Sequence, residues 1–132
     1  MATERKVKAL FSRDDIIHTR GYHVVASALR NGGIEVILGG SQLPREIAAS
    51  AVHEDADIIC YRIESGAPSI LVGKLVDELK QRGASDIPII IGGIIPNDQH
   101  DKLKELGVKG IFAPGSPLEG IVKCAVECAR GK

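Results

Sequence analysis

Five short apolar runs alternate with five stretches of helical periodicity, and the connections between them are short. The fourth run, residues 87–93 (IPIIIGG), is almost uninterrupted in its apolar character, which is typical of a strand covered by helices on both faces. Parallel strands need crossover helices, and right-handed crossovers place those helices on both sides of the sheet. The alternation therefore predicts a single parallel sheet between two helical layers.

The fold class that follows is α/β: a flavodoxin-like (Rossmann-like) three-layer sandwich whose five strands lie in the order 2-1-3-4-5. Pro44 at the start of the second helix suits a first helical position, and Ser116 with Glu119 occupies capping-box positions before the last helix. One face of the first helix is expected to carry Val24, Val25, Ala28 and Leu29. The expected strands are residues 6–11, 34–40, 55–63, 87–93 and 108–115, and the expected helices are residues 19–33, 44–54, 69–83, 97–107 and 116–130.

Length and composition restrict the class of protein further. The 132 residues are enough for one domain, expected to be 1–132 with a core of about 6–117 and a C-terminal helix at 116–130, and 44% of them are apolar. Lys plus Arg and Asp plus Glu number 17 each, so the basic excess of a nucleic-acid binder is missing. The start MATERKVK has no signal-peptide character and no run reaches membrane-spanning length, so we expect a cytoplasmic protein without a membrane partner. Cys60, Cys124 and Cys128 are expected to be reduced thiols.

In folds of this class, ligands bind beyond the carboxyl ends of the strands, near the point where the strand order reverses. The loops expected at that edge are SRDDIIHTRG after the first strand, RIESGAP after the third, GGIIPND after the fourth and APGSP after the fifth. The first contains a histidine, His18, and ends in Gly21. The Gly92-Gly93 pair permits either a close approach by a ligand or a tight turn.

Taken together, these loops resemble those of the cobalamin (B12)-binding domain of the acyl-CoA mutases, of which methylmalonyl-CoA mutase is the best-known member. The resemblance extends from about Lys6 to Pro117. It is closest in VVASALRNGGIEVILGG, in GGIIPNDQHDKLKELGVKGIFAPGS and in the helix start Pro44-Arg45-Glu46. Some members of the family carry this domain as a separate small subunit of about this length.

The resemblance implies a metal-binding role for one loop residue. The family's signature in this loop is Asp-x-His-x-x-Gly, whose histidine is the lower axial ligand of cobalt. Here His18 and Gly21 match, but Ile16 stands at the aspartate position, so Asp15 becomes the expected hydrogen-bond partner through a one-residue insertion. A carboxylate on the second ring nitrogen would fix the tautomer of a ligating imidazole.

The resemblance also implies a site for the nucleotide tail of the cofactor. The family lines it with a Ser-x-Leu segment after the third strand and a Gly-Gly pair after the fourth, which Gly92 and Gly93 match. The third-strand segment reads Arg62-Ile63-Glu64 instead. The two charged residues could pair with each other, or Arg62 could contact the phosphate of the tail, and Ser65 could supply the missing hydroxyl.

The function implied is that of a cobalamin-binding small subunit of a heteromeric, adenosylcobalamin-dependent acyl-CoA mutase, an isomerase whose large barrel subunit binds the acyl-CoA. The alternative is a relative that has lost the cofactor and serves as a structural or regulatory subunit. A receiver domain is disfavoured, because the third and fifth strand ends lack the Asp and Lys that receivers require. A flavodoxin is disfavoured by the two carboxylates in the first loop and by 3% aromatic residues.

Overall fold

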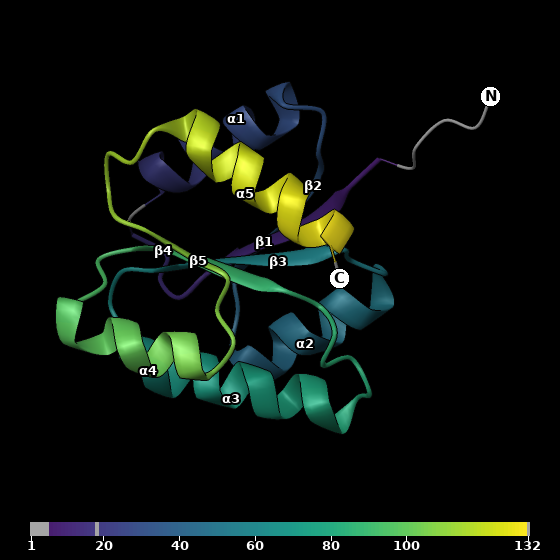
Figure 1. Cartoon of the computed structure of the whole chain (residues 1–132), viewed down its shortest axis with the longest axis vertical. Coiled ribbons are helices and arrows are strands. Elements are labelled where there is room, and N and C mark those ends of the chain that lie inside the picture. The colour runs from purple at the N-terminus through teal and green to yellow at the C-terminus, as the bar shows by residue number, and fades with distance from the viewer. Residues whose placement is uncertain (1–5, 18, 132) are drawn as a thin grey trace.

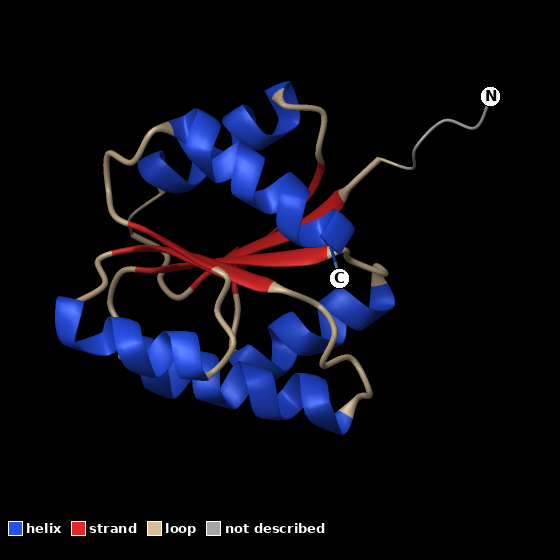
Figure 2. Ribbon diagram, in the orientation of Figure 1, coloured by secondary structure: helices blue, strands red, loops and turns tan. Residues whose placement is uncertain are grey.

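A computed structural model describes residues 6–17 and 19–131 of the chain, and these form a five-stranded parallel sheet in the order β2-β1-β3-β4-β5. Helices α1 and α5 cover one face of the sheet, and α2, α3 and α4 cover the other (Figure 1; Figure 2). Both the predicted strand order and the predicted three-layer architecture are confirmed. The elements are β1 (Lys8–Arg13), α1 (Arg20–Asn31), β2 (Glu35–Ser41), α2 (Pro44–His53), β3 (Ile58–Ile63), α3 (Pro68–Gln81), β4 (Ile89–Gly93), the short 3-10 helix η1 (Asn97–Gln99), α4 (His100–Glu105), β5 (Gly110–Phe112) and α5 (Leu118–Gly131).

The strand register brings the loops singled out above to one edge of the sheet. Arg13 of β1 pairs with Arg62 of β3, which in turn pairs with Gly92 of β4. Since directly paired residues of parallel strands share a face, these three residues form one row across the carboxyl edge. This edge lies at the left of the sheet in Figure 1, opposite the side from which the chain enters β1.

Two separate apolar cores flank the sheet. The core under α2, α3 and α4 contains fully buried side chains such as Ile59, Leu75 and Leu103. The core under α1 and α5 contains Phe11 and Leu29. Successive residues of β3 alternate between these two cores, as the two-residue period of a strand requires.

The first helix buries only part of the face that the sequence suggested. Leu29 is buried and Val25 is partly buried against the core, but Val24 is 47% exposed. Tyr22 and Ala26 are buried in addition. Tyr22 takes the inward position because its hydroxyl finds partners there: it donates to the carbonyl oxygen of Phe11 at 2.6 Å and accepts the N–H of Gly40 at 3.0 Å. The prediction for Val24 was wrong because a tyrosine with satisfied hydrogen bonds can replace an aliphatic residue in a core.

The start of the last helix also differs from the prediction. The Ser116 hydroxyl donates to the carbonyl oxygen of Ala113 at 2.6 Å, and thus closes the turn after β5. Helix α5 then begins at Leu118. Its two cysteines, Cys124 and Cys128, are half-buried beside the packed face, as expected for reduced thiols.

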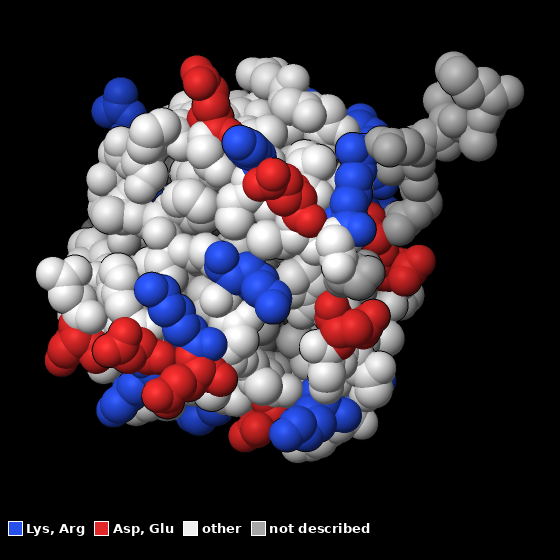
Figure 3. Space-filling model, in the orientation of Figure 1, with Lys and Arg blue, Asp and Glu red and all other residues white. Residues whose placement is uncertain are grey.

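The helices of the described residues include none that is long and apolar enough to cross a membrane. On the face shown in Figure 3, Lys and Arg side chains are interspersed with Asp and Glu side chains. The balance of charge in the sequence is therefore also a balance in space on this face.

Candidate functional site

A cavity of about 490 Å³ opens at the carboxyl edge of the sheet, on the side covered by α1 and α5. Its floor comes from β1, β3 and β4, and its walls from the start of α1 and from the loop between β5 and α5. Its volume is in the range usual for small-molecule sites, about 300–1,000 Å³. The lining residues are Phe11, Arg20, Gly21, Val24, Val25, Cys60, Tyr61, Arg62, Ile90, Ile91, Gly92, Phe112, Ala113, Pro114, Gly115, Ser116, Leu118 and Ile121.

Most of this lining is apolar. The thiol of Cys60 belongs to that apolar wall, since burial raises its pKa to about 12 and keeps it protonated at neutral pH. Val24, whose side chain is exposed on α1, also contributes to the wall. The apolar part of the cavity is therefore suited to an uncharged, apolar group.

The two glycines at the end of β4 have different roles. Gly92 lines the cavity, and a Cβ there would meet only the carbonyl oxygen of Phe112, at 3.3 Å. Gly93 has φ +104°, and a Cβ there would overlap the backbone carbonyl of Ile63 on the neighbouring strand. Gly92 thus leaves space for a ligand, whereas Gly93 satisfies a requirement of the backbone.

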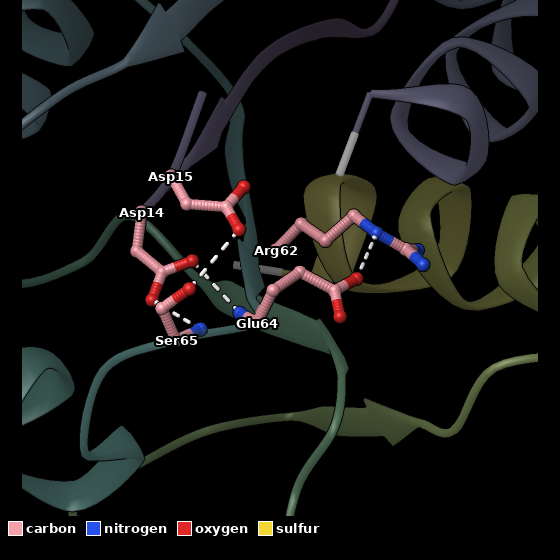
Figure 4. Close-up of polar contacts among 5 residues, drawn as sticks. All are labelled: Asp14, Asp15, Arg62, Glu64 and Ser65. Atoms are coloured by element: carbon pink, nitrogen blue, oxygen red, sulfur yellow. Dashed lines mark hydrogen bonds and ion pairs between the residues drawn. The ribbon is translucent and has the colours of Figure 1, made fainter. Parts of the chain in front are cut away.

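The carboxylate of Asp14 joins the loop after β1 to the loop after β3 (Figure 4). Its oxygens accept the backbone N–H groups of Glu64 at 2.7 Å, Ser65 at 3.0 Å and Gly66 at 2.5 Å. In return, the N–H of Asp14 donates to the carbonyl oxygen of Arg62 at 3.1 Å. Charge-assisted hydrogen bonds of this kind are among the stronger ones in proteins. Together they fix the two loops relative to each other.

Asp15 lies against the same loop. Its carboxylate accepts a hydrogen bond from the hydroxyl of Ser65 at 3.0 Å (Figure 4). The predicted axial ligand, His18, lies outside the described residues, so its relation to Asp15 stays a prediction. Among residues 6–17 and 19–131, no group of three or more His, Cys, Asp or Glu side chains is placed to hold a metal ion.

Arg62 and Glu64 form an ion pair, as one of the two alternatives from the sequence predicted. Nε of Arg62 is 2.6 Å from Oε1 of Glu64, and the side chains are only 14% and 5% exposed. The guanidinium extends under the start of α1, where a Cβ on Gly21 would stand 2.5 Å from its Nη2. The contact that makes a glycine suitable at position 21 is therefore the arginine, and the pair does not fill the cavity, which remains open beside it.

Several site residues were not predicted from the sequence. Asp14 was not singled out, because the backbone N–H groups that its carboxylate accepts lie about 50 positions further along the chain. Phe112 and Leu118, which close the cavity from the β5 side, were interpreted as part of a strand and a helix. Nothing in their sequence context distinguishes a cavity wall from a core.

The apolar cavity, the glycine at its floor and the loop that carries His18 meet at the edge where this fold binds ligands. Residues 8–122 match the family described as the B12 binding domain, and the chain belongs to that family. The 2-hydroxyisobutanoyl-CoA mutase small subunit of Aquincola tertiaricarbonis is 34% identical over 117 residues, which cover 86% of each chain. Methylmalonyl-CoA mutase of Cereibacter sphaeroides is 34% identical over 114 residues. The match with the latter covers 86% of this chain but 16% of that mutase.

Solved structures agree on the fold. The methanol:cobalamin methyltransferase complex MtaBC of Methanosarcina barkeri contains a chain with a TM-score of 0.76 and 21% identity. That match covers 99% of this chain and 50% of the other. Receiver domains of response regulators also share the fold, and this likeness concerns the fold alone.

Proposed function

We propose that this chain is the cobalamin-binding small subunit of a heteromeric, adenosylcobalamin-dependent acyl-CoA mutase. The observation that carries the proposal is the apolar cavity beside Gly92, at the strand edge from which the His18 loop departs. Its apolar lining fits the aromatic base of a nucleotide tail. The relation to the Aquincola tertiaricarbonis small subunit, which has a similar length, supports a separate subunit.

In this proposal His18 is the lower axial ligand of cobalt, with Asp15 as its hydrogen-bond partner. Gly21, Ser65, Gly92 and Gly93 complete the cofactor site. Adenosylcobalamin would supply an organic radical through homolysis of its cobalt–carbon bond. The residues of this chain hold and orient the cofactor, and a large barrel subunit binds the acyl-CoA. The cytoplasmic location and the absence of nucleic-acid and membrane partners remain expectations from the sequence.

The axial ligand can be tested by electron paramagnetic resonance of cob(II)alamin mixed with uniformly ¹⁵N-labelled protein. Coordination by a protein imidazole is expected to replace the nitrogen triplet of the cofactor's own base with a doublet, because ¹⁵N has nuclear spin one-half. His18→Ala should abolish the doublet, since it removes the donor nitrogen. His23→Ala, a change at an exposed position of α1, should leave the doublet intact. A doublet that persists in the His18→Ala protein would refute the assignment.

One observation favours a second candidate, a family member that has lost the cofactor. The buried Arg62–Glu64 pair stands where the family has uncharged residues, and buried charges are poorly suited to an apolar guest. The same paramagnetic resonance experiment separates the two functions. If the spectrum of the cofactor stays unchanged when the protein is present at a saturating concentration, the chain is a structural or regulatory subunit.

The cavity floor offers a further prediction. Gly92→Val should lower the affinity for cobalamin at least about tenfold, because its side chain would project into the space of the tail. The free energy of unfolding should change by less than about 1 kcal/mol, since Gly92 lacks a positive φ and valine suits a strand. Gly73→Val on α3, where an added Cβ meets nothing within 4 Å, is the control for binding. Equal affinity of the Gly92→Val and wild-type proteins would contradict this location of the tail.

A further inference from the structure

The guanidinium of Arg62 is a charged group in the wall of a mostly apolar cavity. Arg62 is paired in register with Gly92, so its side chain leaves the sheet on the cavity side, next to a residue without a side chain. Only 14% of it is exposed. A charge held in such surroundings is stabilised when an opposite charge or a set of acceptors meets it.

Glu64 faces one edge of this guanidinium as an ion-pair partner. Its Oε1 approaches Nε, the inner nitrogen, at 2.6 Å. The terminal nitrogens extend away from Glu64 (Figure 4). Nη2 is the atom that a Cβ on Gly21, at the cavity wall, would meet first. A guanidinium presents five N–H donors in a planar fork, so the pairing at Nε leaves the terminal edge directed toward the cavity side. That edge has the geometry to bind two oxygens of a phosphate.

The charges around Arg62 also favour an anion. Arg20 lines the same cavity, and Arg13 lies in the same row of the sheet, with its guanidinium 4.7 Å from the centre of the Tyr22 ring. Of the nearby carboxylates, Asp14 accepts three backbone N–H groups of the β3–α3 loop. Two arginines, Arg20 and Arg62, therefore line this cavity, and Glu64 pairs with Arg62.

We propose that Arg62 recognises the phosphate diester of the corrinoid's nucleotide tail, and that this chain thereby selects corrinoids with a complete tail over those without one. The inference rests on the proposed function and deepens it. The aromatic base enters the apolar part of the cavity, the diester oxygens receive the Nη edge of Arg62, and Glu64 acts as a positioning residue that holds the guanidinium in place.

The test compares the binding of cobalamin with that of cobinamide, which has the same corrin ring but lacks the phosphate, ribose and base. Both are titrated into wild-type protein and into Arg62→Gln by isothermal calorimetry. Arg62→Gln is expected to weaken cobalamin binding about ten- to a hundredfold and to change cobinamide binding less than about twofold. Arg45→Gln, at an exposed position on the opposite side of the sheet, should change neither.

Two further variants distinguish the loss of phosphate recognition from a loss of folding. Arg62→Lys keeps the charge but loses the fork, and should weaken cobalamin binding by an intermediate factor. Glu64→Gln should also weaken cobalamin binding selectively, because the guanidinium is no longer held. Equal effects on both corrinoids, or none, would overturn the role of Arg62 while leaving cobalamin binding itself in place. A wild-type protein that binds neither corrinoid would overturn the proposed function and this inference together.

Discussion

Gly93→Ala is expected to destabilise the protein by about 3 kcal/mol, which is a large part of the stability of a domain of this size. Two effects act together. Gly93 has φ +104°, a conformation that residues with a Cβ rarely adopt, and the added methyl group would overlap the backbone carbonyl of Ile63. Backbone of a central strand cannot move aside as a flexible side chain could. Urea unfolding followed by circular dichroism measures the loss.

The neighbouring glycine provides the matched control. Gly92→Ala adds the same methyl group to the same strand, but its Cβ would meet the carbonyl oxygen of Phe112 at 3.3 Å, a tight but tolerable distance. We expect a change of less than about 1 kcal/mol. If the two alanine variants unfold at the same urea concentration, the conformational requirement at Gly93 is not what stabilises this turn.

Asp14→Ala is expected to cost about 2 kcal/mol and to release the loop after β3. The variant leaves the N–H groups of Glu64, Ser65 and Gly66 without their acceptor. Because two of these residues are exposed, water compensates in part, which keeps the loss below the sum of three bonds. Amide hydrogen exchange measured residue by residue should show faster exchange at these three amides, and urea unfolding gives the global loss.

A second substitution at Asp14 separates the negative charge of its side chain from the capacity of that side chain to accept hydrogen bonds. Asp14→Asn keeps one oxygen acceptor but places an NH₂ group against backbone donors, so it should destabilise nearly as much as Asp14→Ala. Asp98→Asn, at an exposed position of η1, should have little effect. Unchanged exchange at residues 64–66 in the Asp14→Ala protein would show that the loop does not depend on this carboxylate.

The fold was predictable because its signals are local and repeated. Runs such as Ile89–Ile91, bounded by proline and glycine, favour a buried strand, and the periodic Val72, Leu75 and Leu79 form the buried face of α3. The error on α1 has a physical origin. Val24 is apolar and exposed, while Tyr22 is amphipathic and buried, and periodicity alone does not reveal which residue finds hydrogen-bond partners inside.

The site was predictable only where it depends on residue type. The Arg62–Glu64 pair could be foreseen, because two opposite charges two positions apart on a strand share a face. The distinct roles of Gly92 and Gly93 could not, since they follow from φ at one residue and from a neighbouring strand at the other. The contact of Asp14 spans about 50 positions along the chain, and such long-range partners leave no local pattern. His18 and its pairing with Asp15 remain predictions of the sequence.

The sheet separates two apolar cores, and the candidate cofactor cavity lies on one side of it. Side chains such as Leu75 and Leu103 form the core beneath α2, α3 and α4, whereas the core beneath α1 and α5 is interrupted at the carboxyl edge by the cavity beside Gly92. The candidate cofactor cavity thus lies on one side of the sheet, and the core on the opposite side contributes none of its helices to it. Substitutions of cavity-lining residues on the α1 and α5 side can therefore alter the ligand while the core beneath α2, α3 and α4 stays intact.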